Sequence, residues 1–517
     1  MIWKILLGIA MGIILAGCQA HNVERTLTDP EEFRAFSNNK IAALKSTSPY
    51  LKAHMKSGAV YVFDSWNTDG KGTIITGNAA LFTPTRDIAG KGQFTVGLDS
   101  VAILETNVIE NSGAAAALTI FTGITAAITV SCIANPKACF GSCPTFYVSD
   151  GDSLRLQAEG FSSSISPSME ATDVDALFRA RPVNGELSVE MRNEALETHV
   201  VHHVDLLVVP RQKGCRVFAD NENRFWESEK QIRPLSARGP EGDCLPALLS
   251  LDNNERFSKA DESYLAAKET IELQFRTHPG RNYGLVIGCR QSLLPTYLLY
   301  QMYAYMGNDV GHWVAEIERK NFGGQSDRLE ELIGGIDATV LQTDGHWNSI
   351  GGVNEHGPLA TDVHLLPIGL LSDSIVTMQL RLTKGAWRID YVALAEISQP
   401  IDPIRVHPFS VLKKDKEDPD DHIALLDSAQ HLITYPGDSY ILKYALPKEH
   451  ADYELFLESR GYYLEWIRKE WIEEENPLLL SEMFMAPESA LKRLAPEFKR
   501  VEPQMENCFW RSRYAKP

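Results

Sequence analysis

Short runs of β-branched and aromatic residues recur along this chain, and turn-forming Gly, Asn and Asp residues separate them. The first such runs occupy residues 59–63, 72–76, 93–98 and 101–105. The segments 67–70 and 89–92 between them are typical of turns. Runs this short, bounded by turn signals, predict strands rather than helices. We therefore expect a small antiparallel β domain over residues 51–109, folded as a barrel or roll.

Two long strands are predicted in the next part of the chain. Residues 185–191 alternate in polarity, and residues 200–209 form a nearly unbroken apolar run. A continuous apolar strand is expected where both faces of a sheet are covered. These features predict a β-sandwich over residues 137–260, with a polar excursion after residue 210.

Strand-like runs return after this excursion, at residues 270–275 and 283–287 and between 337 and 397. They predict a second sandwich over residues 261–400 with inserted helices. Its last run, 387–394, is similar to the closing strand of jelly-roll modules of the galactose-binding type, which is a fold-level analogy.

Helical signals are concentrated in three places. Residues 29–32 read Asp-Pro-Glu-Glu, a typical helix start. Pro295 is expected to open a tyrosine-rich helix that Gly307 ends. In the C-terminal part we expect a strand over residues 452–459 and a helix from Tyr462, because the aromatic residues that follow have helical spacing.

Together these patterns predict an α+β, β-dominated multidomain protein with jelly-roll-like sandwiches and a helical C-terminal part. At 517 residues the chain is too long for one ordinary core. The expected divisions begin with a signal peptide (1–17), a tether with a helical lead-in (18–50), the small β domain (51–109) and an uncharged linking helix (110–136). They continue with two sandwiches (137–260 and 261–400) and a strand plus helical region (401–517).

The linking segment contains a stretch, residues 113–134, without a single charged residue. Its length would cross a bilayer. It is rich in Ala, Gly and Thr, however, and lies between two segments that both read as exported β structure, so a single crossing would put one of them in the wrong compartment. We favour a packed helix and keep membrane insertion as the alternative.

The first eighteen residues read as a secretory signal. Lys4 precedes an apolar run over residues 5–14, and small residues follow. The ending Leu-Ala-Gly-Cys at residues 15–18 resembles the lipobox of bacterial lipoproteins. The resemblance implies that Cys18 is acylated, for example with palmitate, and becomes the mature N-terminus. Gln19 rather than aspartate follows, which by analogy with lipoprotein sorting indicates the outer membrane.

The acidic charge of the chain limits the classes of partner that it can bind. The formal net charge is −18 at pH 7, and an acidic protein repels phosphate backbones, so we expect no nucleic-acid partner. No long basic block is present to bind anionic lipid. Attachment to the membrane is therefore expected through the N-terminal lipid.

Seven cysteines remain besides Cys18, so at least one thiol is free or pairs between chains. An oxidising compartment would permit disulfides among the others. Cys215 with Cys244 is the best candidate pair. Cys139 with Cys143, or with Cys132, is a second, and spacing alone does not decide the connectivity.

Residues 139–147, CFGSCPTFY, carry a further resemblance. Here the chain resembles a group of uncharacterised bacterial envelope lipoproteins with this stretch. The resemblance continues in five later segments, 158–161, 170–173, 290–294, 357–362 and 459–466. It implies a shared architecture and an exported location, and it transfers no activity and no catalytic residue.

His199, His203 and Asp205 are the best metal-like set, because strand alternation would place them on one face and His202 on the other. Their spread along the strand makes them weak candidates, and no metal site is assigned. A second group could form a ligand-binding loop, namely His346, Trp347, Glu355, His356 and Asp362.

No catalytic residue is assigned, since the sequence lacks a nucleophile elbow, a P-loop, a dinucleotide fingerprint and an HExxH motif. No cofactor is expected. The leading interpretation is a lipid-anchored, non-catalytic cell-envelope protein that binds or scaffolds other envelope components. The alternatives are a hydrolase of envelope glycans or polymers and a glycan-binding lipoprotein.

Overall fold

The structure, a computed structural model, describes most of the chain. The described residues are 22–28, 30–36, 38–47, 51–55, 59–69, 72–82, 88–110, 143–162, 164–165, 170–195, 197–307, 327–354, 357–414, 416–448, 452–465 and 474–511. The chain divides into two compact units, Met1–Ala126 and Ala127–Pro517. Each is described by itself.

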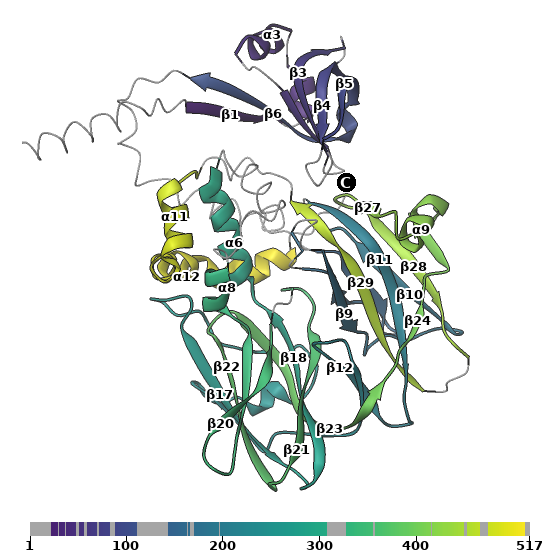
Figure 1. The fold of residues 1–517 in the computed structure, drawn as a ribbon, viewed down its shortest axis with the longest axis vertical. Helices are drawn as coiled ribbons and strands as arrows, with labels where there is room; N and C mark the ends of the chain where they lie inside the picture. Colours follow the sequence, from purple (N-terminus) through teal and green to yellow (C-terminus); the bar gives the residue numbers. More distant parts are fainter. Residues whose placement is uncertain are drawn as a thin grey trace, which may run out of the picture. The chain divides into compact units, whose positions relative to one another are not determined.

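The smaller unit is a six-stranded antiparallel sheet with two helices (Figure 1). Its order is β1-β6-β2-β3-β4-β5, with bounds Asn22–Thr28, Val101–Glu110, Leu51–Met55, Val60–Thr68, Ile74–Phe82 and Ile88–Gly97. Helices α2 (Pro30–Arg34) and α3 (Asn38–Thr47) connect β1 to β2. Phe33, Phe63 and Trp66 are among its buried core residues.

Two expectations for this unit need correction. Residues 18–50 were expected to form only a tether and a helix, but β1 pairs with β6 and adds an edge strand to the sheet. In the described residues the strand order is linear, with β1 and β5 at its edges, so the sheet is not closed as a barrel. Residues 22–28 form a strand because their backbone pairs with β6, and a strand at the edge of a sheet needs only one neighbour.

The larger unit begins with a sandwich of two sheets, which we call the first sandwich. One sheet has the order β26-β25-β28-β10-β7-β8, with bounds Lys416–Glu417, Ser410–Lys413, Ser439–Ala445, Glu186–Arg192, Thr145–Ser149 and Leu154–Glu159. The other has the order β24-β11-β29-β9, with β27 also paired to β11, and bounds Ile404–Val406, Glu197–Pro210, Tyr453–Glu465, Ala171–Ala176 and Leu432–Thr434. Phe146, Val189, Leu206, Leu442 and Leu457 lie in the shared core.

The first sandwich is discontinuous in sequence. Strands β24 to β29 come from residues 404–465 and pair with strands from residues 145–210. The expected sandwich over 137–260 and the expected separate region over 401–517 are therefore not two modules, because strands from both segments build the first sandwich. Burial requires the apolar faces of β11 and β29 to be covered, and the covering strands are supplied from both ends of the larger unit.

The second sandwich is inserted between these halves. One sheet has the order β13-β12-β21-β18-β23-β16, with bounds Phe225–Ile232, Arg216–Asp220, Asp362–Leu371, Arg281–Gln291, Trp387–Ile401 and Arg256–Phe257. The other has the order β15-β14-β17-β22-β19-β20, with bounds Gly242–Asp243, Ser236–Gly239, Lys268–Arg276, Ile375–Thr383, Ile336–Leu341 and Trp347–Val353. Leu285, Ile287, Phe275, Met378 and Trp387 lie in its core.

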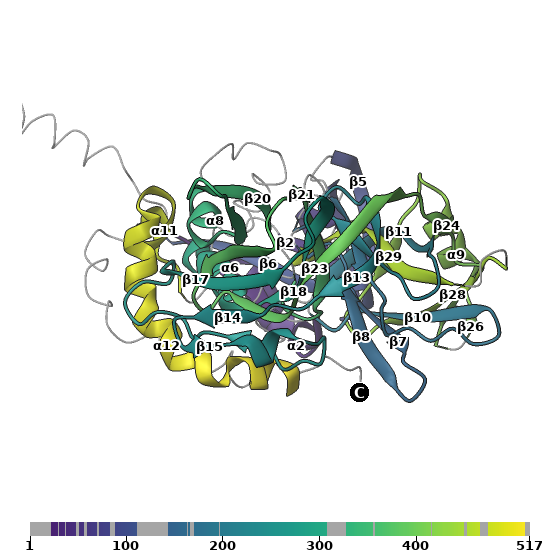
Figure 2. The same cartoon turned by 90° about the horizontal axis from the view of Figure 1, so that it is seen from below.

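Four helices complete the core of the second sandwich. They are α6 (Leu293–Met306), α8 (Asp327–Ile333), α11 (Pro477–Met485) and α12 (Pro487–Arg511). Figure 1 shows these helices gathered beyond one end of β17 and β22, and in the view from below in Figure 2 α11 and α12 lie toward one side of the sandwich. The Ser292 hydroxyl caps α6 by accepting a hydrogen bond from the Leu294 N–H at 3.0 Å, and Gly307 ends the helix with φ 51°.

The β-dominated, multidomain fold class with a helical C-terminal part is confirmed. The helix expected from Tyr462 is wrong, because β29 continues to Glu465. Tyr463 faces the first-sandwich core, while Tyr462 and Leu464 pack with Val200 on the other face, which is strand alternation. Residues 113–134 lie outside the described residues. Within the described part of the chain, no helix is long and apolar enough to span a bilayer.

The expected Cys215–Cys244 disulfide is not formed. Both are buried free thiols, as are Cys143 and Cys289. Cys215 directly precedes β12 and Cys244 directly follows β15, so the two belong to opposite sheets of the second sandwich. Cys18, Cys132 and Cys139 lie outside the described residues.

Candidate functional site

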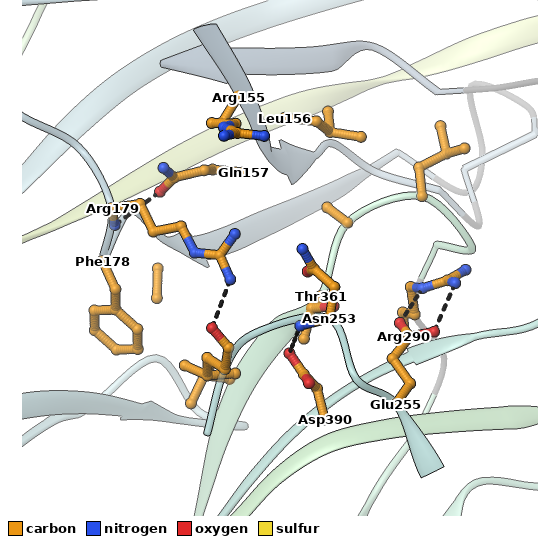
Figure 3. A pocket seen from close by; sticks show the side chains of 15 residues that line it. Arg155, Leu156, Gln157, Phe178, Arg179, Asn253, Glu255, Arg290, Thr361 and Asp390 are labelled. Carbon is orange, nitrogen blue, oxygen red and sulfur yellow. Dashed lines mark hydrogen bonds and ion pairs between the residues drawn. The ribbon is translucent and has the colours of Figure 1, made fainter. Parts of the chain in front are cut away.

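A cavity of about 390 Å³ lies between the two sandwiches of the larger unit (Figure 3). Small-molecule sites typically measure about 300–1,000 Å³. The first sandwich contributes residues of β8 and of the segment after β9. The second contributes the segment before β16, the end of β18, the segment before β21, and β23. The polar lining residues are Arg155, Gln157, Arg179, Asn253, Glu255, Arg290, Thr361 and Asp390.

Gln157 and Arg179 form the wall on the side of the first sandwich. The Gln157 Oε1 accepts a hydrogen bond from the Arg179 backbone N–H at 3.1 Å. The Gln157 Nε2 is buried and has no hydrogen-bond partner among the described residues. The Arg179 Nη2 donates to the Leu251 carbonyl at 2.6 Å, and no described carboxylate forms an ion pair with this guanidinium. This wall therefore offers hydrogen-bond donors and an unneutralised positive charge.

The opposite wall is organised by Asn253, which has a φ of 67°. Left-handed backbone is tolerated better by Asn than by most residues. In this conformation its N–H donates to the Asp390 Oδ2 at 3.0 Å. Burial raises the pKa of Asp390, and the backbone hydrogen bonds only partly offset this effect. Figure 3 shows Asn253, Thr361 and Asp390 across the cavity from Gln157 and Arg179.

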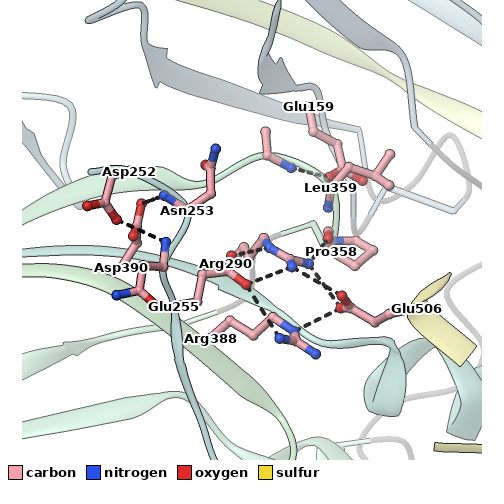
Figure 4. Close-up of polar contacts among 12 residues, drawn as sticks. Glu159, Asp252, Asn253, Glu255, Arg290, Pro358, Leu359, Arg388, Asp390 and Glu506 are labelled. Atoms are coloured by element: carbon pink, nitrogen blue, oxygen red, sulfur yellow. Dashed lines mark hydrogen bonds and ion pairs between the residues drawn. The ribbon is translucent and has the colours of Figure 1, made fainter. Parts of the chain in front are cut away.

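The remaining side of the cavity is a buried ion-pair network (Figure 4). Arg290 is 7% exposed. Its Nε lies 2.5 Å from Glu255, and its Nη1 lies 3.1 Å from Glu506 and 2.7 Å from the Pro358 carbonyl. Arg388 contacts the same two glutamates. Because Glu506 belongs to α12, the network connects the C-terminal helix to β18 at the cavity.

Beside the cavity lies a group that we call the acid cluster, made of Glu159, Asp173, Asp175, Asp362 and His364. Glu159 accepts hydrogen bonds from the Leu359 and Ala360 N–H groups, the former at 2.7 Å. His364 Nε2 lies 2.6 Å from the Asp362 Oδ2. Buried carboxylates gathered in this way perturb one another strongly.

The pKa values in the acid cluster follow from burial and from like charges. Burial raises the pKa of Asp173 to about 6, and the charge of Asp362 adds to the effect. Burial and the charges of Asp362, Asp173 and Glu159 raise the pKa of Asp175 well above its usual range. Burial lowers the pKa of His364, but Asp362 and Asp173 outweigh it and the pKa rises.

These shifts predict a pH dependence of stability. A carboxyl whose pKa is higher in the folded state binds more protons there than in the unfolded chain, so its contribution to stability grows as the pH falls. Lowering the pH from about 8 to about 5 should add on the order of 1–3 kcal/mol from Asp173. In Asp173→Asn this gain should disappear, as measured by calorimetric unfolding at both pH values. Asp344→Asn, an exposed carboxyl, should behave like the parent protein, and an unchanged pH dependence in Asp173→Asn would contradict the assignment.

Close approach of chain segments explains two glycines beside the acid cluster. A Cβ on Gly357 would lie 2.1 Å from the Glu159 carboxyl carbon. A Cβ on Gly160 would lie 2.5 Å from the Ser459 hydroxyl. These contacts bring together parts of the segments 158–161, 357–362 and 459–466. The Gln291 N–H donates to the Gly357 carbonyl and adds the segment 290–294.

A second polar site lies on the outer face of the β11–β29 sheet, and we call it the histidine face. It contains His202, His203, His407 and His431 with the carboxylates of Glu170, Asp205 and Glu458 and the guanidiniums of Arg405 and Arg460. A β-bulge between Val201 and His203 creates it. The extra residue turns both His202 and His203 to the outer face.

Because of the bulge, the predicted alternation of His199, His202, His203 and Asp205 between the two faces of the strand is wrong in part. His199 pairs with Tyr463 and faces the core, where it is fully buried beside Glu197, with Nε2 2.7 Å from Oε1. His203 and Asp205 do share the outer face, as predicted. They are bound to charged neighbours: His203 Nε2 lies 3.0 Å from Glu458, and Arg405 Nη1 lies 2.8 Å from Asp205. Burial acts to raise the pKa of Glu458, but His203 and Arg405 outweigh it and lower the pKa to about 2.

The expected ligand loop is not assembled as one site. His346 and Trp347 are exposed at the turn between β19 and β20. Asp362 instead starts β21, pairs with Cys289 and is buried in the acid cluster. Glu355 and His356 lie outside the described residues. The cavity residues Gln157, Arg179 and Asn253 were missed, because no spacing in the sequence connects them.

No protein-family model and no curated protein sequence matches the chain. Among solved structures, the chain is similar to an allantoicase at 9% identity, over 54% of this chain and 99% of that chain, with a TM-score of 0.17. It is also similar to the GH31 alpha-xylosidase from Xanthomonas citri at 9% identity, over 81% of this chain and 37% of that chain, with a TM-score of 0.15. Likenesses this low assign neither a fold family nor an activity.

Proposed function

We propose that the protein is a lipid-anchored, non-catalytic component of the bacterial outer membrane that binds an acidic sugar residue of an envelope glycan. The observation that carries the proposal is the wall of the cavity formed by Gln157 and Arg179. A buried amide donor without a described partner and a guanidinium without a described carboxylate both line the same cavity.

The chemistry of the cavity supports this ligand class. Arginine binds carboxylates through paired N–H donors. The Gln157 amide, the Thr361 hydroxyl and the Asn253 amide line the same cavity and can hydrogen-bond sugar hydroxyls. Phe178 and Leu156 line it as well and supply apolar surface for the sugar ring.

Arg179→Met should weaken binding at least about tenfold, because a charged hydrogen bond contributes about 1.5–3 kcal/mol. The measurement is isothermal titration of the full chain with D-glucuronic acid, its oligosaccharides and N-acetylmuramic acid, with D-glucose as the uncharged comparison. The matched control is Arg181→Met, since Arg181 lies two residues further on and is not a cavity-lining residue. Equal losses in both variants, or no binding of any acidic probe, would overturn the proposal.

A second candidate function is hydrolysis of an envelope glycan. The acid cluster favours it, since an acid with a pKa of about 6, such as Asp173, suits general acid catalysis near neutral pH. The same panel of oligosaccharides discriminates the two functions. Turnover by the parent protein that is lost in Asp173→Asn would support the hydrolase, whereas binding without turnover supports the non-catalytic protein.

A further inference from the structure

The histidine face contains two groups of side chains whose potential ligand atoms lie within 4.8 Å of one another. They are Glu170 with His202 and His431, and His203 with Asp205 and Glu458. Both lie outside the cavity described above, and neither contributes a residue to it. They differ in how many of their carboxylate oxygens are already bound by arginine: one oxygen of Glu170 in the first group, but both oxygens of Glu458 and one of Asp205 in the second.

The second group is already neutralised by protein cations. Arg405 contacts Asp205 and both oxygens of Glu458, and His407 Nδ1 lies 2.8 Å from the Asp205 Oδ1. A metal ion would have to displace the Arg405 guanidinium from two carboxylates. This group is therefore not proposed as a metal site.

The first group has the composition of a metal site. Two imidazoles and one carboxylate are ligands that zinc and other transition ions prefer. His202 Nδ1 lies 3.0 Å from the Glu170 Oε1, and the His202 and His431 rings are 4.9 Å apart between centroids. Ligands about 2.0–2.1 Å from a tetrahedral ion are separated by about 3.4 Å. The three side chains are thus close to the spacing that an ion requires.

Outer contacts hold the carboxylate in place. The Arg460 Nη2 donates to the Glu170 Oε2 at 2.9 Å, and its Nη1 donates to the Thr172 hydroxyl at 3.1 Å. These bonds leave Oε1 directed at His202. Such orientation of a ligand by a neighbouring side chain is a usual part of metal sites.

The charge of the histidine face also suits a cation. Its three carboxylates, Glu170, Asp205 and Glu458, outnumber its two guanidiniums, Arg405 and Arg460, which leaves one net negative charge when the histidines are neutral. His431 is exposed, so the group is open to solvent on one side. An ion there would keep water in its remaining coordination positions.

We propose that Glu170, His202 and His431 bind a divalent transition-metal ion at the surface of the first sandwich. The three ligands come from three separate segments, the residue before β9, the bulge in β11 and the residue before β27. The ion would cross-link these segments, so binding should stabilise the larger unit. The proposal does not depend on the glycan-binding function, because no ligand is shared with the cavity.

The test is titration of the full chain with Zn²⁺, followed by calorimetry and by unfolding temperature, and with Co²⁺, followed by its visible absorption. The parent protein should bind one ion in this site and unfold at a higher temperature with Zn²⁺. His431→Ala, at an exposed position that should not affect folding, should weaken binding at least about tenfold and abolish the thermal shift, as should Glu170→Gln.

His407→Ala is the matched control, since it removes a histidine from the same face but outside the ligand group. It should bind Zn²⁺ like the parent protein. Equal weakening in His407→Ala and His431→Ala, or a parent protein that neither binds Co²⁺ nor is stabilised by Zn²⁺, would overturn the proposal.

Discussion

Cys18→Ser is expected to abolish acyl labelling of the protein and to move it from the membrane fraction to the soluble fraction. Burial of an acyl chain contributes about 0.8 kcal/mol per CH₂, and stable anchoring needs more than one signal or chain. The net charge of −18 provides no electrostatic substitute. Loss of the chains on Cys18 should therefore remove nearly all of the membrane affinity.

Metabolic labelling with palmitate and fractionation of cell envelopes measure this effect. Cys215→Ser is the control, because Cys215 is a buried thiol of the folded larger unit and should not affect acylation. A Cys18→Ser protein that stays in the membrane fraction would contradict the lipid anchor. It would point instead to the uncharged run of residues 113–134 as the membrane-attached segment.

Arg290→Met is expected to lower the free energy of unfolding of the larger unit by about 3–5 kcal/mol, the typical cost of removing one partner from a buried ion pair. Arg290 is 7% exposed, and its guanidinium contacts both Glu255 and Glu506. Arg388, which contacts the same two carboxylates, would have to compensate both of them alone. The loss also removes a contact that connects α12 to β18.

Chemical denaturation and limited proteolysis test this second prediction. The proteolysis should show earlier cleavage near α12 in Arg290→Met, because Glu506 belongs to that helix. The control is Arg224→Met, whose side chain is half-exposed. Its buried partner Asp220 also accepts hydrogen bonds from the Glu222 N–H and the Trp226 Nε1, so the loss should be less than about 1 kcal/mol. Similar stability losses in the two variants would show that the Arg290 network is not a structural support of the cavity.

The local patterns of the sequence predicted strands well where one physical signal dominated. The apolar run in β11 and the β-rich runs of residues 59–105 became strands, because alternating or continuous apolar residues satisfy a sheet locally. The turn predicted over residues 89–92 is wrong, since these residues belong to β5, which pairs with β4. The aromatic run after Tyr462 was different. Its spacing fits a helix as well as a strand, and only pairing with β11 made it the end of β29.

The candidate sites were less predictable. His203 and Asp205 were predicted to share one strand face. Because the bulge inserts one residue, His202 lies on that face with them, and His199, which was predicted there, faces the core instead. A bulge changes the face of each following side chain, and the sequence carries no strong signal for it. His431 and Glu170 lie 229 and 32 residues from His202 in the chain, so no motif connects them.

What the sequence by itself determined is therefore the local character of the chain: its β-dominated runs, its acidic balance, the end of the tyrosine-rich helix at Gly307, and the expectation of a lipid at Cys18. The start of that helix was predicted at Pro295, but the Ser292 cap places it at Leu293. Tertiary structure alone decided which strands complete the first sandwich, and it brought Gln157 to Arg179 and His202 to His431. Strand patterns report which face is buried. The partner that buries it depends on long-range packing, and both candidate sites are products of that packing.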